Sequence, residues 1–248
     1  GATAKKIVRA LGRFESPEHP AMPFDGQEDR ETAAGKRRES ARAKTTKGPP
    51  LDEVMQAYDA HLKMTPDMHD AVWTMMAVHA STSWGSEPLW MFVVGPPGSG
   101  KTELLVSMSD APDTLYQSSV DAKALCSGFR TGGKDPSLLP KMIGRCAIFK
   151  DWTELLEQHP DDLKKTYGVF RGAFDGHVAR HYGNAEEREY FGTFHLLAGV
   201  TNKIHAHGTA TVGERFLKFQ LPKMAKRTRE DIIMRAIMNT CREEKKSA

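Results

Sequence analysis

The sequence predicts a three-layer α/β domain built around a central parallel sheet. Three observations predict it: the glycine-rich stretch Gly95–Thr102 directly follows the apolar run Leu89–Val94, a helical pattern begins at Lys101, and further apolar runs alternate with helical patterns. An unbroken apolar run is typical of a strand buried on both faces of a parallel sheet. Strand, loop and helix in alternation therefore predict helices on both faces of that sheet.

The composition limits the classes of protein that remain. A chain of 248 residues with 39% hydrophobic residues supports one substantial core and argues against two full domains. The formal net charge of +3 does not by itself indicate a nucleic-acid partner. Three widely spaced cysteines without a C-x-x-C pair argue against a zinc site or a disulfide scaffold. No apolar run approaches the roughly 20 residues that span a bilayer, so we expect a cytoplasmic protein with no membrane partner.

Two helices are predicted before the glycine-rich stretch. The first follows Pro50, and its apolar positions include Val54, Tyr58 and Leu62. The second begins at Thr65-Pro66, because threonine can cap a helix and proline fits its first position. Its apolar stripe should face the core and comprises Met68, Val72, Trp73, Met76 and Val78.

Four further segments are predicted to be buried strands: 114–120, 146–149, 195–200 and 216–221. A hairpin is predicted between a helix that ends near Asp175 and the strand 195–200. Its two strands are 177–180 and 188–194, and its turn lies at 183–187.

The stretch Gly95–Thr102 fits the phosphate-loop pattern G-x-x-x-x-G-K-[ST] in full. Glycines let backbone N–H groups face phosphate oxygens, and the following helix directs its positive end at them. Lys101 is expected to reach the β- and γ-phosphates, and the Thr102 hydroxyl to bind Mg²⁺. ATP and Mg²⁺ are therefore the predicted cofactors. The predicted nucleotide contacts are Gly95, Pro96, Pro97, Gly98, Ser99, Gly100, Lys101, Thr102 and Glu103.

Polar residues follow two of the predicted strands. Asp151 ends the run 146–149, in the arrangement of a Walker B carboxylate that holds Mg²⁺ or orients the attacking water. Thr201 and Asn202 end the run 195–200, and at the shared carboxyl edge of a parallel sheet they would face the γ-phosphate. The alternative is an ordinary strand-end turn, since asparagine tolerates left-handed backbone.

From Leu89 to about Leu221 the order of these motifs resembles an AAA+ ATPase. A helix, a hairpin and a strand in succession is similar to the branch that carries a hairpin before sensor 1, which includes minichromosome-maintenance helicases and bacterial enhancer-binding activators. The chain looks closer still to ATPases of phages and mobile elements that are described as replication helicases. The matching segments are 95–105, 150–151, 174–176, 197–201 and 213–216.

The resemblance implies roles for further residues. Asn202 or Thr201 would be sensor 1, and Arg215 would be the arginine finger that reaches the nucleotide of a neighbouring subunit. A homo-oligomer, as a ring or a helix, is thereby implied. A guanidinium acting in trans can stabilise charge on the γ-phosphoryl group by roughly 10³-fold or more in rate. The alternative for Arg215 is an ordinary surface arginine.

Two departures from the family pattern leave alternatives open. The usual Asp-Glu pair of Walker B is here Lys150-Asp151. In one alignment Asp151 takes the position of the metal-linked acid, and Glu154 is then the nearest residue that could act as the base. In the other alignment Asp151 takes the position of the catalytic glutamate. Slow hydrolysis is a possible consequence. The second departure is that only one helix, at about 226–242, follows the core where a helical lid is usual, and Arg235 is the sensor-2 candidate there.

The predicted domains are a flexible basic arm at 1–50, an AAA+ core at 51–225 and a C-terminal helix with little or no lid at 226–248. DNA is the expected partner. Several basic groups could contact the DNA phosphates, and the alternative is that they are solvated surface. They are the clusters 36–47 and 223–229, the residue Lys134 and the hairpin residues Arg180, His181 and Arg188. His205-Ala206-His207 is interpreted as a loop, because no matching ligand spacing accompanies it.

Three functions are compatible with these patterns. The first is an oligomeric AAA+ motor that hydrolyses ATP and acts on DNA, as a helicase or helicase loader of a phage or mobile element. The second is a slowly hydrolysing, ATP-switched module that assembles on DNA or protein. The third is a small-molecule P-loop kinase, in which the hairpin and Arg215 would have no evident use.

Overall fold

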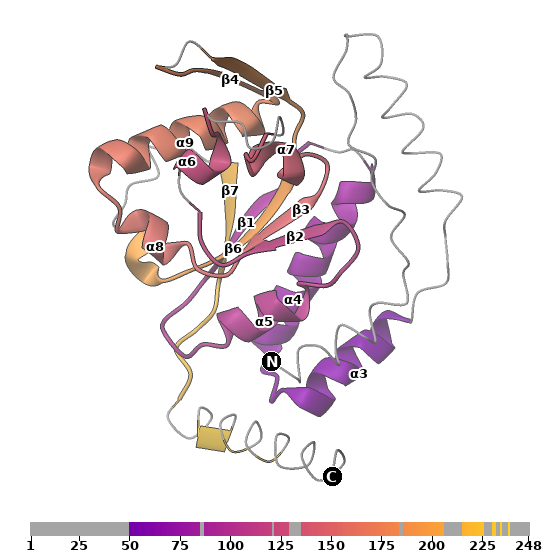
Figure 1. The fold of residues 1–248 in the computed structure, drawn as a ribbon. Helices are drawn as coiled ribbons and strands as arrows, with labels where there is room; N and C mark the ends of the chain where they lie inside the picture. Colours follow the sequence, from indigo (N-terminus) through magenta and orange to yellow (C-terminus); the bar gives the residue numbers. More distant parts are fainter. Residues whose placement is uncertain are drawn as a thin grey trace, which may run out of the picture.

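The computed structural model (Figure 1) describes residues 50–248 except 85–86, 121, 129–134, 184–185, 206–214, 226–229, 232–233, 235–237 and 239–248. The predicted basic arm therefore lies outside the described residues, apart from Pro50. The same holds for most of the predicted C-terminal helix, including Arg235.

Five parallel strands form one sheet in the order β2-β3-β6-β1-β7. Their bounds are β1 Trp90–Val94, β2 Thr114–Gln117, β3 Cys146–Phe149, β6 His195–Val200 and β7 Phe216–Gln220. Because the strands are parallel, all of their carboxyl ends lie at one edge of the sheet. The phosphate loop follows β1 at that edge.

The central strands are buried on both faces, as their unbroken apolar runs predicted. In β1 the side chains of Trp90, Phe92 and Val94 belong to one core cluster, and those of Met91 and Val93 belong to the other. This is the alternation that a pleated strand imposes. The first cluster is rich in aromatic rings, and the indole N–H of Trp90 donates to the carbonyl oxygen of Phe194 at 2.8 Å.

Helices cover both faces of the sheet, which gives the predicted three layers (Figure 1). On the face of Met91 lie α3 (Leu51–His61), α4 (Pro66–Ser81) and α5 (Lys101–Ser107). On the other face lie α6 (Ala122–Leu125), α7 (Leu139–Met142), α8 (Thr153–Leu156) and α9 (Pro160–Phe174). The 3-10 helices are η1 (Thr82–Trp84) and η2 (Asn202–His205). The structure thus confirms the predicted fold class, a three-layer α/β domain with a central parallel sheet.

The predicted start of α4 is confirmed, and one residue of its apolar stripe is wrong. Thr65 Oγ1 accepts a hydrogen bond from the Met68 amide at 3.3 Å, and Pro66 occupies the first helical turn. Trp73 was expected in the core, but it is 39% exposed. Ala71 and Met75 are fully buried on this helix, so the stripe that faces the sheet runs beside Trp73.

Two strands that were predicted to be buried lie at the edges of the sheet. The strand β2 ends at Gln117 rather than Val120, and its side chains are only partly buried. In β7 only Phe216 is buried, and Leu217 is 51% exposed. An apolar run does not reveal whether a strand has neighbours on both sides, and each of these strands has only one within the described sheet.

The predicted hairpin is confirmed as β4 (His177–His181) and β5 (Glu187–Phe191), paired antiparallel and separate from the main sheet. Its second strand ends at Phe191 rather than at residue 194, because Gly192 follows with a φ angle of 119°. It follows α9 and leads into the amino end of β6. The hairpin is therefore at the opposite end of the sheet from the phosphate loop, as Figure 1 shows by the positions of β4, β5 and α5.

Candidate nucleotide site

The phosphate loop spans Gly95–Thr102 and joins β1 to α5. Gly98 and Gly100 have φ angles of 76° and 86°, a region that favours glycine. The amide of Gly95 donates to Val200 at 3.1 Å, so the start of the loop is fastened to the end of β6. Backbone turns of this kind direct successive N–H groups to one side, which suits an anion.

Lys101 is folded over its own loop. Its Nζ donates to the carbonyl oxygens of Gly95 at 2.7 Å and Pro96 at 2.9 Å, and it lies 3.3 Å from Ser99 Oγ. Burial lowers the pKa of Lys101, and the negative charge of Asp151 acts in the opposite direction. The ammonium is thus held at the loop by oxygen atoms of the loop itself.

The structure places Asp151 close enough to Lys101 for its charge to affect the pKa of Lys101. Asp151 follows β3 and is exposed, and its Oδ1 accepts the amide hydrogen of Thr153 at 2.7 Å. The next amide, of Trp152, donates to Gly199 at 2.7 Å, so the turn after Asp151 is joined to β6. The charge of Asp151 acts on the pKa of Lys101 against the larger effect of burial, so Asp151 lies within electrostatic reach of the phosphate loop.

Glu154, Glu103 and Thr102 are the other candidate groups of the site. Glu154, in the first turn of α8, and Glu103, on α5, are exposed. The charge of Glu103 contributes to the raised pKa of Tyr116 on strand β2, after the larger effect of burial. Thr102 is half-buried at the start of α5. Of the described groups, Thr102 and Asp151 offer the hydroxyl and carboxylate oxygens that suit Mg²⁺.

The two candidates at the end of β6 face different neighbours. The Thr201 amide lies 3.3 Å from Thr153 Oγ1, which in turn lies 3.4 Å from Thr201 Oγ1. Asn202 Oδ1 instead accepts from Gln220 Nε2 at 3.2 Å, at the end of β7. Thr201 is thereby tied to the turn of Asp151, and Asn202 to the next strand. No sequence signal identified Thr153 or Gln220 as partners, because these contacts depend on the strand order.

Arg215 lies at the other edge of the sheet. It immediately precedes β7, whose five residues at about 3.3 Å each separate it by roughly 16 Å from the loop edge. Its Nη2 donates to both carboxylate oxygens of Asp175, at 3.2 and 3.3 Å. Arg215 therefore does not join the phosphate loop of its own chain. Glu214 and Gly213, which precede it in the matched motif, lie outside the described residues.

A small cavity of about 130 Å³ opens beside the phosphate loop. Since a water occupies about 30 Å³ of liquid, the cavity has room for a group of ring size. Met68 borders it closely: a Cβ atom at Gly100 would lie 3.1 Å from the Met68 methyl carbon. The cavity is lined by Thr65, Asp67, Met68, Ser99, Leu221, Pro222, Met224 and Ala225. The sequence marked Thr65 only as a helix cap.

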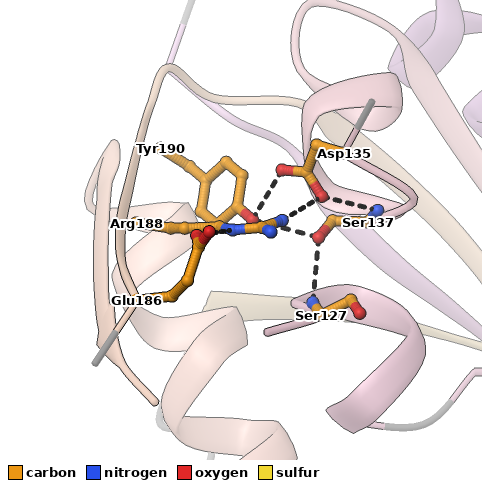
Figure 2. Close-up of polar contacts among 6 residues, drawn as sticks. All are labelled: Ser127, Asp135, Ser137, Glu186, Arg188 and Tyr190. Atoms are coloured by element: carbon orange, nitrogen blue, oxygen red, sulfur yellow. Dashed lines mark hydrogen bonds and ion pairs between the residues drawn. The ribbon is translucent and has the colours of Figure 1, made fainter. Parts of the chain in front are cut away.

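The hairpin residue Arg188 was a candidate for contact with DNA, and it is instead buried, with its side chain 6% exposed. Figure 2 shows its guanidinium between two carboxylates: Nη1 lies 2.6 Å from Asp135 Oδ1 and Nε lies 3.2 Å from Glu186 Oε2. Tyr190 donates to Asp135 at 2.9 Å, and Ser137 lies 3.0 Å from the Tyr190 hydroxyl. Arg188 thus fastens the hairpin to the loop that contains Asp135.

The other basic candidates of the hairpin differ from Arg188. His181 is exposed and lies 3.4 Å from Glu187 across the hairpin. Arg180 is half-buried beside the thiol of Cys126, whose pKa burial raises to about 11 even though the charge of Arg180 lowers it. Lys134 lies outside the described residues. His205 Nε2 lies 3.4 Å from Gln220, and Ala206-His207 also lie outside the described residues.

Within the part of the chain that the structure describes, no helix is long and apolar enough to cross a bilayer. The same residues contain no group of three or more His, Cys, Asp or Glu side chains that could hold a metal ion by themselves. A metal at Asp151 would therefore need oxygen ligands from elsewhere, such as Thr102 or a nucleotide.

Comparison with known proteins returned solved structures only. No protein-family model and no curated protein matches the sequence. Two structures of NtrX from Brucella abortus are similar, one of them in complex with ADP. That one is 12% identical with a TM-score of 0.42, over 82% of this chain and 42% of the other. The second is 14% identical with a TM-score of 0.44, over 83% of this chain and 46% of the other. The chain thus spans less than half the length of either protein.

Proposed function

We propose that this chain is an ATP-hydrolysing subunit of an oligomeric AAA+ motor that acts on DNA, as a helicase or helicase loader of a phage or mobile element. The observation that supports it best is the pairing of a full phosphate loop with the carboxylate of Asp151, whose charge acts on Lys101. These are the groups that ATP hydrolysis needs on one side of the nucleotide.

Each of these groups has a distinct task in the proposed reaction. Backbone N–H groups of the loop and the ammonium of Lys101 bind the phosphates and neutralise charge on the γ-phosphoryl group. Mg²⁺, held by Thr102 and Asp151, would add charge neutralisation at the phosphates. Thr201 and Asn202, at the same edge of the sheet, are the candidates to orient the attacking water. The cavity beside Ser99 is the proposed site of the nucleotide base.

The active site is proposed to be completed by a second subunit. Arg215 is separated from the loop of its own chain by the length of β7, so it can serve only a nucleotide bound elsewhere. A guanidinium supplied in trans stabilises the transition state of phosphoryl transfer. This placement favours an oligomer over a small-molecule kinase, which would have no use for an arginine at the far edge.

DNA as the substrate rests on the resemblance to hairpin-bearing AAA+ ATPases. The basic cluster 36–47, which could contribute to such contacts, lies outside the described residues. Arg180 and His181 remain the hairpin candidates for phosphate contact. Arg188 is excluded from this role by its burial between Asp135 and Glu186.

The decisive variant is Arg215→Ala, with Arg171→Ala as the matched control because Arg171 is an exposed arginine on α9. Arg215→Ala is expected to abolish ATP turnover while leaving ATP affinity within about twofold, whereas the control keeps both. Turnover should be measured with single- and double-stranded DNA, and particle size with ATP. Full activity of Arg215→Ala, or a strict monomer with ATP, would contradict the proposal.

A slowly hydrolysing ATP-switched module is the second candidate, and Lys150 favours it. Lys150 precedes Asp151 and brings a positive charge to the position where the family pattern has a metal-linked carboxylate. In this case ATP binding would drive assembly on DNA or protein with little turnover. Brisk hydrolysis stimulated by DNA would exclude the module, and ATP-dependent assembly without turnover would exclude the motor.

A further inference from the structure

The side chain of Arg215 is held by the end of helix α9. Its Nη2 lies 3.2 Å from Asp175 Oδ1 and 3.3 Å from Asp175 Oδ2, so one nitrogen is shared by both carboxylate oxygens. The guanidinium carbon lies 5.5 Å from the centre of the Phe174 ring, which forms a cation–π contact. Arg215 is 30% exposed and Asp175 59% exposed, so the pair lies at the surface.

The base of this arrangement is part of the core. The Phe174 ring packs edge-on against Trp90 at 5.0 Å, and Phe216, the residue after Arg215, stacks on Phe92 at 4.0 Å. The Nε atom of Arg215 is enclosed and makes no hydrogen bond with the described residues. The inner half of the side chain is therefore fixed by packing, and only the outer part of the guanidinium can reach another molecule.

The backbone fixes the carboxylate as well. The amide of Asp175 donates to Arg171 at 3.0 Å and so closes the last turn of α9. Gly176 follows with a φ angle of 85°, which turns the chain into β4 and leaves the Asp175 side chain beside Arg215. Both partners thus come from rigid positions, a helix end and the start of a strand.

From these contacts we propose that Asp175 is the positioning residue of Arg215: it holds the guanidinium in the orientation that meets the nucleotide of a neighbouring subunit. This inference rests on the proposed function, in which Arg215 acts in trans. A long arginine side chain has many rotamers, and fixing one of them before the subunits meet removes an ordering cost from each turnover. The proposed role is in orientation, since Asp175 itself would touch no phosphate.

Steady-state kinetics of the full chain provide the first test. Asp175→Ala is expected to lower kcat for ATP about tenfold and to leave KM within about twofold, because the phosphate loop is untouched. Asp175→Asn keeps one acceptor oxygen and should recover most of the lost kcat. The matched control is Asp161→Ala, which removes an exposed carboxylate at the other end of α9 and should keep the kcat of the unchanged chain.

Mixing of subunits provides the second test, and it separates positioning from a general loss of structure. Lys101→Ala subunits keep an intact Arg215 but have a weakened nucleotide site of their own. At an ATP concentration that fills only the sites with an intact Lys101, mixing them with Arg215→Ala subunits should restore turnover. Asp175→Ala should behave like Arg215→Ala: its turnover should rise on mixing with Lys101→Ala and stay low on mixing with Arg215→Ala. A defect confined to its own nucleotide site would show the reverse pattern.

Each outcome bears on a different claim. If Arg215→Ala keeps full turnover, the proposed function fails. If Arg215→Ala is inactive while Asp175→Ala keeps or exceeds the normal kcat, the proposed function stands and the positioning role of Asp175 is overturned. If Asp175→Ala is slow but is not rescued by Lys101→Ala subunits, the positioning role is likewise overturned.

Discussion

The ammonium of Lys101 lies 2.7 Å from the carbonyl oxygen of Gly95, the first residue of the same phosphate loop. With the contact to Pro96 at 2.9 Å, this closes the loop over six residues of chain. The side chain that should bind phosphate therefore also stabilises the shape of the loop. Its loss should affect the protein in two measurable ways.

Lys101→Ala is expected to weaken ATP binding about 10- to 100-fold, because charge-assisted hydrogen bonds to phosphate are lost. It should also lower the free energy of unfolding by about 1 kcal/mol, because two loop carbonyl oxygens lose their donor. Calorimetric titration with ATP and denaturant unfolding measure the two effects. Lys165→Ala, which removes an exposed lysine on α9, is the control and should change neither. Unchanged ATP affinity in Lys101→Ala would exclude the assigned role.

Asp151→Asn is expected to lower kcat about 100-fold or more while ATP still binds, because the acid that acts with Lys101 is neutralised. Lys150→Ala is the neighbouring control on the same turn, and it should retain turnover because it leaves the carboxylate of Asp151 in place. Turnover over a range of Mg²⁺ concentrations is the measurement. If Glu154→Gln rather than Asp151→Asn removes activity, the base has been assigned to the wrong acid.

Gly199→Ala should disturb the site through the backbone. A Cβ atom at Gly199 would lie 2.8 Å from the carbonyl oxygen of Lys150, so β6 and the turn of Asp151 would have to separate. We expect a loss of about 1–3 kcal/mol in the free energy of unfolding, with reduced turnover. Gly168→Ala is the matched control: nothing lies within 4 Å of its Cβ position on α9, so it should stabilise the chain by roughly 0.5–1 kcal/mol. Equal effects of the two variants would refute this account of Gly199.

Removing the Arg188 side chain should cost about 3–5 kcal/mol, because Arg188→Ala leaves the Asp135 carboxylate without its buried partner. The double variant Arg188→Met with Asp135→Asn should recover part of that loss, since the charge of Asp135 is then removed together with its partner and only Glu186 loses an ion pair. His181→Ala, on the exposed side of the hairpin, should change the free energy of unfolding by less than about 0.5 kcal/mol. Denaturant titration of the three variants is the measurement, and a double variant as unstable as Arg188→Ala would contradict the ion-pair explanation.

His195 should make stability depend on pH. Burial, with a smaller effect from the charge of His79, lowers the pKa of His195 to about 4, and its Nδ1 accepts the Leu89 amide hydrogen at 3.1 Å. The unfolded chain binds a proton near pH 6.5 and the folded chain near pH 4, so stability is full above pH 6.5 and falls as the pH drops through that window. We expect a loss of roughly 1–2 kcal/mol between pH 7 and pH 5. His195→Asn keeps an acceptor and should remove part of this slope in denaturant unfolding; an unchanged slope would exclude His195 as its source.

The local features of the fold followed from the sequence more closely than its long-range contacts did. The bounds of β3 and β6 agree with their apolar runs, and the Thr65 cap agrees with its motif. The edge positions of β2 and β7 did not follow, because strand order depends on pairings between distant segments. Trp73 likewise showed that a helical period places an apolar stripe only to within a neighbouring residue.

In the candidate site, too, the residues of local motifs were predicted from the sequence, whereas the long-range contacts were not. The phosphate loop was identified from a contiguous motif, and Asp151 from its place after a strand. Arg188 was misjudged because its partner Asp135 is 53 residues away in the chain, and no local pattern announces such a pair. The link between Asn202 and Gln220 depends in the same way on which strand lies beside β1.

The placement of Arg215 and the phosphate loop at opposite edges of one sheet has a genetic consequence. In an assembly of the proposed kind, loss of Arg215 at the amino edge of the sheet would inactivate the nucleotide site of the next subunit. The subunit that lacks Arg215 could still hydrolyse ATP when the neighbour that supplies an arginine to its own site is intact. A cell carrying one normal and one Arg215-deficient copy of the gene would then assemble mixed oligomers in which some subunits cannot hydrolyse ATP. Such alleles should be dominant, and alleles that prevent folding of the same chain should be recessive.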